Sequence, residues 1–211
     1  MSLLGMSLAE YLSAAADGNP VPGGGSTAAL AGALGCSMAL MAITISSAAP
    51  GASPELAQMS DFFSSSLDEF AQRVDADATA YSQFRENLKI QSGTAAQRAM
   101  RGARLQMALG DTVRVPLEVA GQAATTLVAL VPLVSACAPS VLSNVGAASS
   151  LLRASFESAR FTAMVNMKMI NDPQLVSSLS ENLSKYGRMC EKSHRKIAKS
   201  IASGLEPDEK P

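Results

Sequence analysis

Several residue types are scarce in this chain, and each shortage excludes a kind of function. Among its 211 residues there is no tryptophan, aromatic residues make up 4% and charged residues only 17%. The formal net charge is −1, so the chain lacks the basic excess that attracts a polyanion, and we expect no nucleic-acid partner. There is one histidine, and the three cysteines, Cys36, Cys137 and Cys190, are too far apart to form a metal-ligand spacing. We therefore expect no metal site.

The cysteines and the first residues also bear on location. An odd number of cysteines without a signal peptide is typical of a reducing compartment, which predicts a cytoplasmic protein. The opening stretch, MSLLGMSLAEYLSAAADG, lacks the positively charged start of a secretion signal. It predicts a helix instead, because Ser7 and Glu10 have the spacing of a capping box and the apolar residues that follow share one helical face.

The abundant residue types favour helices. Hydrophobic residues make up 47% of the chain, and β-branched residues rarely cluster, which is typical of closely packed helices. We predict an all-α, single-domain bundle of about six helices over residues 1–204, with a long central helix and a flexible C-terminal tail at 205–211. Ser26 and Ser53 are the expected N-caps of the second and third helices, which end near residues 49 and 90. A fourth helix begins near Thr94 and kinks or breaks at Pro116 and Pro132, and two more follow from residue 145.

Residues 26–47 carry no charge and are long enough to cross a bilayer. Two interpretations are open, a membrane span and a buried central helix. Glycine and alanine supply much of the stretch, no Lys or Arg flanks it, and we find no comparable second span, so the buried helix is favoured. We expect no membrane partner.

One carboxylate stands out in the predicted third helix. Alternating steps of three and four residues select an apolar packing seam along it, formed by Phe63, Leu67, Phe70, Val74, Asp77, Tyr81, Phe84 and Leu88. Asp77 is the only carboxylate on this seam, whereas Asp75 faces elsewhere and is expected to be solvated. Burial disfavours the charged form, so we expect a raised pKa for Asp77, as occurs in functional sites and in some structural pairs. Tyr81, one turn further on the same face, is either a second pocket residue or a core tyrosine.

A glycine run precedes the uncharged stretch, in GNPVPGGGSTAALAGALG at residues 18–35. The segment GGGSTA formally fits a dinucleotide-binding fingerprint, but the segment before it is helical and no acidic residue follows at the required place. A phosphate-binding loop would need a lysine where Ser26 stands. Two interpretations remain: bare backbone at a helix N-terminus that suits an anionic or carbonyl group of a ligand, or a tight turn that lets helices approach closely.

Four segments, in order, resemble the cyclodeaminase/cyclohydrolase family, which includes the cyclodeaminase domain of formiminotransferase-cyclodeaminase and bacterial methenyltetrahydrofolate cyclohydrolases. NPVPGGGSTAALAGALG is similar to the family's P-x-P-G-G-G-S segment, and VDADATAY at residues 74–81 is similar to its D-x-E-A-F segment, with the aspartate at Asp77. VPLEVA at 115–120 matches a V-P-L element. Residues 142–172 are similar to an S-D-x-G-V-A…N-V-x-I-N-L stretch, with Asn166 on the second asparagine. The resemblance covers nearly the whole chain.

The resemblance implies an all-helical homodimer that acts on one-carbon tetrahydrofolates, with a folate as small-molecule substrate and no separate cofactor. It implies that Asp77 is the catalytic residue. It further implies that the substrate is bound by the glycine loop, the helix that follows it and the later asparagines, namely by Pro22, Gly23, Gly24, Gly25, Ser26, Asn144 and Asn166. Tyr81 joins this set of expected binding residues through its place on the seam.

The chain also departs from the family pattern. Thr79 replaces a glutamate, Ile90, Gln91 and Ser92 replace an L-P-K element, and Asn144 replaces an aspartate. Three functions therefore stay open. Hydrolysis of 5,10-methenyltetrahydrofolate to 10-formyltetrahydrofolate is the expected one, by analogy with family members that have no formiminotransferase domain. The alternatives are a formiminotetrahydrofolate cyclodeaminase that releases ammonia, and an inactive folate-binding or structural homologue.

Overall fold

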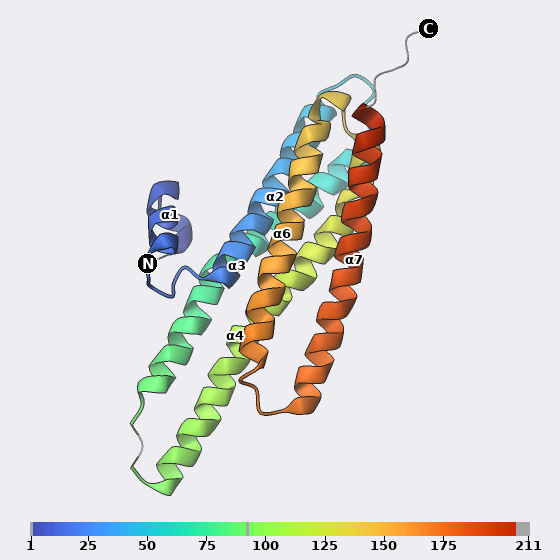
Figure 1. Cartoon of the computed structure of the whole chain (residues 1–211). Coiled ribbons are helices and arrows are strands. Elements are labelled where there is room, and N and C mark those ends of the chain that lie inside the picture. Colours follow the sequence, from blue (N-terminus) through green and yellow to red (C-terminus); the bar gives the residue numbers. More distant parts are fainter. Residues whose placement is uncertain (1, 92, 206–211) are drawn as a thin grey trace.

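The computed structural model describes residues 2–91 and 93–205, and it is helical almost throughout. In chain order the elements are η1 (Leu3–Gly5), α1 (Leu8–Ala16), α2 (Gly24–Ser47), α3 (Glu55–Lys89), α4 (Ala95–Leu130), α5 (Leu133–Ala136), η2 (Pro139–Val141), α6 (Leu142–Met167) and α7 (Pro173–Leu205). The long helices α2, α3, α4, α6 and α7 form an elongated bundle, and α1 stands beside it (Figure 1). The described residues contain no strand, which confirms the all-α prediction. Residues 206–211 of the predicted tail lie outside the described residues.

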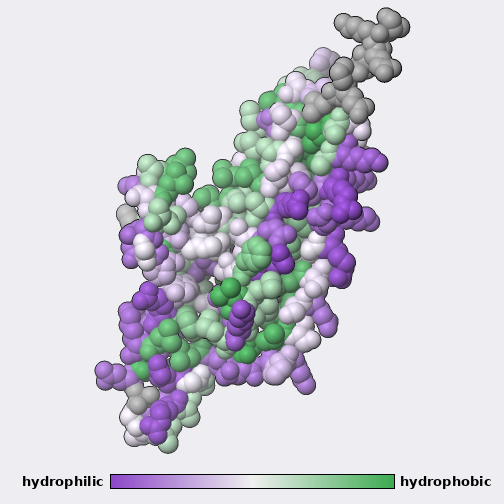
Figure 2. Space-filling model, viewed as in Figure 1, coloured by the Kyte–Doolittle hydropathy of each residue, from purple (hydrophilic) through white to green (hydrophobic). Residues whose placement is uncertain are grey.

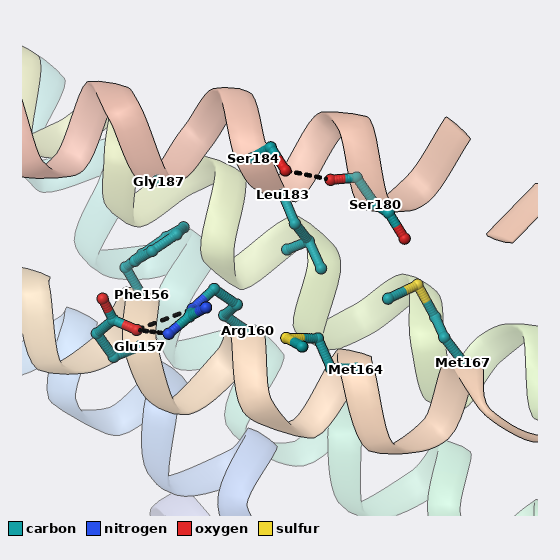
Figure 3. Close-up of a pocket in the computed structure, with 9 residues that line it drawn as sticks. All are labelled: Phe156, Glu157, Arg160, Met164, Met167, Ser180, Leu183, Ser184 and Gly187. Carbon is teal, nitrogen blue, oxygen red and sulfur yellow. Dashed lines mark hydrogen bonds and ion pairs between the residues drawn. The ribbon is translucent and has the colours of Figure 1, made fainter. Parts of the chain in front are cut away.

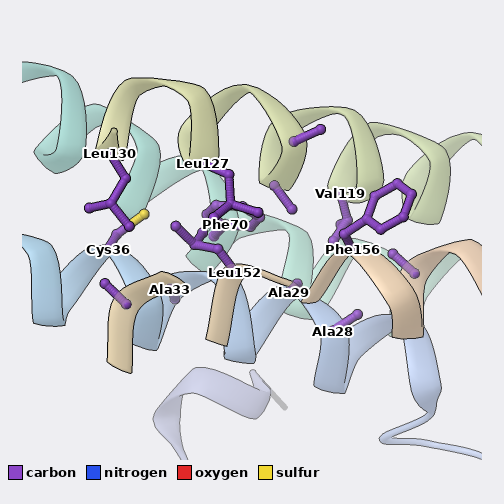
Figure 4. Packing of buried hydrophobic residues seen from close by; sticks show 14 of the residues in the cluster. Ala28, Ala29, Ala33, Cys36, Phe70, Val119, Leu127, Leu130, Leu152 and Phe156 are labelled. Carbon is purple, nitrogen blue, oxygen red and sulfur yellow. The ribbon is translucent and has the colours of Figure 1, made fainter. Parts of the chain in front are cut away.

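The interior helix is α2, which packs against α6, α3 and α4. It has 24 residues and none of them is charged. Two of its glycines let neighbouring helices approach closely. A Cβ atom at Gly32 would lie within 3 Å of three ring atoms of Phe70 on α3, and one at Gly35 would lie 2.8 Å from Leu152 Cγ on α6. Figure 4 shows Ala33 of α2 in the same buried cluster as these larger side chains. The prediction of a buried central helix is therefore confirmed.

The helix boundaries agree with the predicted ones to within a few residues, with two errors at N-caps. Gly23 is the N-cap of α2, so the prediction that Ser26 caps this helix is wrong. Similarly, Pro54 rather than Ser53 is the N-cap of α3. Pro116 lies inside a continuous α4, whereas Pro132 follows the end of that helix. The α2 helix can begin earlier than predicted because the N–H of Ser26, in its first turn, has its acceptor on α3, as described below.

The N-terminal helix α1 begins as predicted. The hydroxyl of Ser7 accepts a hydrogen bond from the backbone N–H of Glu10, and the Glu10 carboxylate accepts one from the backbone N–H of Ser7. Tyr11 is the buried residue of this helix, and its hydroxyl lies 3.3 Å from Thr27 Oγ1 on α2. The capping box is confirmed, and Tyr11 attaches α1 to the start of α2.

Two helical stretches are long and apolar enough to cross a membrane by length and composition, Gly24–Ser47 and Ala95–Ala136. The expectation that no second such stretch exists is therefore wrong. Half of the most apolar window in the first stretch, and 44% of that in the second, is buried inside the fold. The core helices of a bundle pass the same test of length and composition, and this burial is what the buried-helix interpretation predicts.

The close contact at Gly32 allows a test of α2 packing. We expect Gly32→Ala to lower the free energy of unfolding by about 1–3 kcal/mol, because the added methyl group would overlap the fully buried Phe70 ring. The matched control is Gly102→Ala in α4, where nothing lies within 4 Å of the added atom and alanine should stabilise the helix by about 0.5–1 kcal/mol. Chemical denaturation of the two variants measures both changes, and equal effects would contradict this account of the packing.

Candidate active site

Asp77 reaches the N-terminal end of α2 from the neighbouring helix α3. Its Oδ2 accepts a hydrogen bond of 2.9 Å from the backbone N–H of Ser26. A Cβ atom at Gly25 would lie within 3 Å of three carboxyl atoms of Asp77, so the carboxyl group rests directly on the Gly25 backbone. The first N–H groups of a helix have no partner inside it, and Gly23 as N-cap has no side chain to supply one. Asp77 supplies the acceptor from another helix.

The surroundings of Asp77 favour its neutral form. Burial raises the pKa of the Asp77 carboxyl above its usual value, and the hydrogen bond from Ser26 opposes part of that rise. The side chain is half-buried, and none of the ion pairs within residues 2–91 and 93–205 includes it. The raised pKa and the inward orientation predicted from the apolar seam are both confirmed. The site thus holds a carboxyl group with no cationic partner among the described residues, at the positive end of a helix dipole.

The other residues of the predicted glycine loop have packing roles. A Cβ atom at Gly24 would lie 2.9 Å from Thr162 Oγ1 on α6. The Ser26 side chain is fully buried, 3.4 Å from the Tyr11 hydroxyl, and Pro22 is buried as well. These contacts support the interpretation of a tight turn that lets helices approach closely. A role of Pro22, Gly23, Gly24, Gly25 and Ser26 in substrate binding stays a prediction.

Asn166 lies one turn after Thr162 on α6 and connects this helix to α4. Its Nδ2 donates a hydrogen bond of 2.8 Å to the backbone carbonyl of Thr112. Pro116 has no N–H group, so the Thr112 carbonyl lacks the partner that the residue four positions later normally supplies in an α-helix. Asn166 therefore satisfies the carbonyl that Pro116 leaves open. This pairing explains why α4 stays continuous at Pro116, where a break or kink was predicted.

The structure does not bring Asn144 to Asp77. Asn144 lies in the first turn of α6, and Thr162, which contacts the start of α2, comes 18 residues later. A helix rises about 1.5 Å per residue, so the two positions are about 27 Å apart along the axis. Asn144 Oδ1 accepts a hydrogen bond of 3.3 Å from Ser143 Oγ. Within one chain, Asn144 therefore lies far from Asn166 along α6, and its role in substrate binding stays a prediction.

Beyond Asp77, the seam of α3 leaves the bundle interior. Phe70 is fully buried, but Tyr81 and Phe84 are only half-buried and Leu88 is 46% exposed. The reason is that α2 begins at the level of Asp77, while α3 and α4 extend past that level as a helical hairpin (Figure 1). Tyr81 therefore lies one turn from Asp77 on the same face, as predicted, but outside the closed core.

We use the term open end for the region in front of the α2 N-terminus, between α3, the first half of α4 and the last turns of α6. Each of these three helices contributes one stripe of residues at helical spacing. The stripe of α3 contains Asp77, Tyr81, Phe84 and Leu88, that of α4 contains Arg101 and Leu105, and that of α6 contains Thr162 and Asn166. Arg101, Leu105 and Thr162 were not predicted. The signal for the first two was the apolar stripe of α4 at Ala108 and Thr112, which continues backwards to them at helical spacing. No group of three or more His, Cys, Asp or Glu residues that could hold a metal ion occurs in the described residues.

A hollow of about 530 Å³ lies beside α3 near this end, but its lining includes Asp75 and Thr79 rather than Asp77. Asp75 faces away from the seam and is partly exposed, as expected, and it also has partners within the chain. Its carboxylate accepts hydrogen bonds of 2.6 Å from Ser2 Oγ and from the backbone N–H of Leu3. The chain start folds back onto α3, a long-range contact that the pattern within α3 could not indicate.

A second hollow, of about 340 Å³, lies between α6 and α7 and contains none of the predicted site residues. Figure 3 shows apolar side chains, including Met164 and Leu183, around it. Its two charged residues, Arg160 and Glu157, form an ion pair with each other at 2.6 Å. Since its charges are already paired, this hollow is a weaker candidate for catalysis than the unpaired carboxyl at the open end.

The raised pKa of Asp77 predicts how stability depends on pH. A carboxyl whose pKa is raised by folding stabilises the folded state fully below its unfolded pKa, and this contribution is lost as pH rises through the folded pKa. We therefore expect the free energy of unfolding of the wild type, minus that of Asp77→Asn, to increase as pH falls from 7 toward 4. Denaturant titrations of both proteins at several pH values measure this difference. A difference that decreases over this range would show that the Ser26 bond outweighs burial.

Comparisons with known proteins agree with this architecture. A family model described as formiminotransferase-cyclodeaminase matches residues 7–185. The formimidoyltransferase-cyclodeaminase of Gallus gallus is 28% identical over 188 residues, which are 84% of this chain and 34% of the relative. That of Mus musculus is 29% identical over 174 residues, which are 81% of this chain and 32% of the relative. The chain thus spans about a third of the length of these curated relatives.

A solved structure shows the same fold. The crystal structure of formiminotetrahydrofolate cyclodeaminase from Thermotoga maritima matches with a TM-score of 0.84 at 21% sequence identity, covering 94% of this chain and 96% of that chain. The likeness extends over nearly the whole helical bundle, as the resemblance of the four sequence segments implied. Because the family model covers residues 7–185, this chain belongs to the formiminotransferase-cyclodeaminase family.

Proposed function

We propose that this chain closes the ring of 5-formiminotetrahydrofolate to give 5,10-methenyltetrahydrofolate and ammonia, with Asp77 as the proton-transfer residue. The observation that supports this proposal is the Asp77 carboxyl itself, which is half-buried, has a raised pKa and has no cationic partner among the described residues. The relatives named cyclodeaminases make this reaction the favoured one within the family.

The reaction moves one proton from N10 to the leaving nitrogen. The formimino group enters as its protonated amidinium, so its nitrogen already carries two protons. N10 of the folate attacks the formimino carbon, forming a C–N bond, and the N10 proton passes to the ionised carboxyl group. The carboxyl group gives this proton to the former formimino nitrogen, the bond between that nitrogen and the carbon breaks, and the nitrogen leaves as ammonia while the positive charge stays on the methenyl product. The carboxyl group thus ends ionised, as it began.

The protonation state of Asp77 does not separate this reaction from hydrolysis of methenyltetrahydrofolate, the reaction expected from the sequence. Both reactions begin with proton transfer to the ionised carboxyl group, from N10 in the first case and from water in the second. Hydrolysis is therefore the competing outcome, and the two substrates separate the two reactions.

The open end supplies surroundings that suit a folate. The aromatic rings of Tyr81 and Phe84 follow Asp77 at helical spacing and offer apolar surface for the pterin and benzoyl rings. In this arrangement the reacting carbon lies against Asp77, and the rest of the folate extends along α3.

We also propose that the chain pairs with a second copy through α1 and α2. The exposed side of the uncharged α2 carries Leu34, Met41 and Ile45, which are 41–49% exposed. Leu8 and Leu12 of α1 are 70% and 58% exposed. Figure 2 shows apolar surface on α1 and on the adjacent part of α2, with a recess between them. The uncharged apolar stripe of α2 lies next to the exposed leucines of α1. Such a surface suits a two-fold contact, in which each copy covers the same surface of the other.

The enzyme proposal predicts activity that depends on Asp77. Purified protein mixed with 5-formiminotetrahydrofolate should produce the near-ultraviolet absorbance of methenyltetrahydrofolate, and Asp77→Asn should lower kcat by about 10²–10⁴-fold because the proton shuttle is lost. The matched control is Asp68→Asn, an exposed aspartate on the same helix, which should keep the wild-type rate.

A parallel assay starts from methenyltetrahydrofolate and follows the loss of the same absorbance. Faster loss than in buffer, together with no turnover of the formimino substrate, would replace the cyclodeaminase proposal by the hydrolase. If both substrates react no faster than in buffer, the chain is not a catalyst of either reaction, and the alternative of an inactive folate-binding or structural homologue is supported.

The pairing proposal predicts a concentration-dependent dimer. In sedimentation or light-scattering measurements we expect the mass of a dimer for the wild type and of a monomer for the double variant Leu34→Glu, Met41→Glu, because two buried charges would disrupt an apolar contact. Leu175→Glu introduces a charge at a similarly exposed leucine on α7 and should leave the dimer intact. A monomeric wild type would contradict the proposal.

A further inference from the structure

The outward side of α7 carries an unbroken row of cations. Residues 185–199 contain six lysines and arginines and one acidic residue, a formal charge of +5 in a chain whose net charge is −1. Leu183, Cys190 and Ile197 are the buried residues of this segment that face the bundle. The opposite side of the helix holds residues at alternating steps of three and four, which we call the cationic stripe: Lys185, Arg188, Lys192, Arg195 and Lys199.

Solvent reaches the whole length of the cationic stripe. All five members are exposed, and so is Lys196 beside them. The first and the last member are 14 residues apart, which corresponds to about 21 Å along the helix axis. Figure 2 shows hydrophilic surface along the edge of the molecule that α7 forms in Figure 1. The stripe is therefore available to a partner over about four helical turns.

Most of these charges are not compensated within the chain. Arg195 is ion-paired with Glu191 of its own helix at 2.8 Å. The other four members belong to none of the ion pairs among residues 2–91 and 93–205. Successive members are neighbours on the helix surface, and like charges at this spacing destabilise a helix. The stripe therefore lowers the stability of the isolated chain, and an anionic partner would remove this repulsion.

The helices on either side of α7 do not widen the positive surface. Glu118 of α4 lines a hollow together with Tyr186, and Glu157 of α6 lines another together with Ser184, so each flank has a carboxylate. Both carboxylates are ion-paired with an arginine of their own helix, at 2.8 Å on α4 and 2.6 Å on α6. The uncompensated charge is thus a line about one side chain wide.

A long and narrow line of charge suits a rod-shaped partner. A flat anionic surface would also cover the flanking helices, where the charges are already balanced. A partner α-helix with carboxylates at alternating steps of three and four residues presents them about every 5 Å along one side, the same interval as in the cationic stripe. Each cation can then lie opposite one carboxylate.

A second copy of this chain does not offer such a helix. Between residues 2 and 205 no two acidic residues are three or four positions apart. The stripe also lies away from the surface proposed for pairing, because α7 packs against α4 and α6, whereas α1 stands on the other side of the bundle (Figure 1). The matching partner is therefore a different protein, and the proposed dimer leaves α7 free to bind it.

We infer that the cationic stripe of α7 binds an acidic helix of another protein, in which Glu or Asp recurs at alternating steps of three and four residues. Single exposed ion pairs are weak, so the affinity depends on matching the whole row, and it falls as salt is added. This interaction is independent of the reaction proposed for Asp77.

The test measures fluorescence anisotropy of two labelled, alanine-rich helical peptides with the full chain at low salt. The first peptide has five glutamates at alternating steps of three and four residues. The second has the same composition with a glutamate at every fifth residue, which distributes the charges around the helix. We expect the first to bind about ten-fold more tightly, because only its carboxylates reach the stripe together. Equal affinities, or no binding of the first peptide, would overturn the inference.

Two double variants separate the stripe from the overall charge. Arg188→Gln with Lys192→Gln should weaken binding of the first peptide by about three-fold to thirty-fold, the loss of two exposed ion pairs. The matched control, Arg85→Gln with Arg104→Gln, removes two exposed cations from α3 and α4 and should keep the wild-type affinity. Equal losses in both would show that net charge alone attracts the peptide. The stripe variant should unfold at no lower denaturant concentration than the wild type, because like-charge contacts are removed.

Two further ligands test the class of the partner. Vesicles that contain phosphatidylserine and a short DNA duplex are compared with the first peptide at the same salt and at equal concentrations of anionic groups. We expect both to bind more weakly than the peptide, because neither matches the narrow row. Tighter binding of either one, lost in the variant of Arg188 and Lys192, would assign the stripe to a membrane or a nucleic acid and overturn the acidic helix as its partner.

Discussion

The contact between the Asp77 carboxyl group and the backbone of Gly25 and Ser26 is the interaction on which the rest of the structure depends. It closes the N-terminus of α2, because the carboxyl oxygen accepts the hydrogen bond that no N-cap side chain supplies. It also joins the start of α2 to α3, and the carboxyl group forms no ion pair in the described part of the chain. Any side chain at position 25 would displace this carboxyl. The helix start and the candidate catalytic group are thus one feature.

The small residues of α2 determine the shape of the bundle around this contact. Glycines at positions 32 and 35 let Phe70 and Leu152 approach the α2 backbone, so the interior is filled by large side chains from the neighbours rather than from α2 itself. The first turn of α2 contacts α3 at Asp77, and α3 continues beyond this level without α2 beside it. The stripe that buries Phe70 therefore continues past the start of α2, where Tyr81 and Phe84 are only half-buried.

The candidate site could be predicted from sequence only in part, for identifiable reasons. Asp77 and Tyr81 were found because helical periodicity places them on an apolar seam, and the structure confirms their shared face. Asn144 was grouped with them through a motif, but a continuous α6 carries it about 27 Å from Thr162. The role of Asn166 depends on Pro116, which lies 50 residues earlier, and no local pattern joins the two. Arg101 lies on the same helical stripe of α4 as the buried Ala108 and Thr112, but α2 does not extend far enough to cover it, and the sequence of α4 alone does not show this.

The amino-acid sequence by itself determined that the chain is helical, that α2 is a central buried helix and that Asp77 is unusual among its carboxylates. These properties follow from composition and from periodicity within single helices, which are local. Only the tertiary structure decided which backbone the carboxyl meets, that Asp75 holds the chain start, and that Asn166 completes the α4 ladder. Each of these is a contact between segments far apart in the sequence, set by how helices pack, and packing depends on the shapes of all neighbours at once.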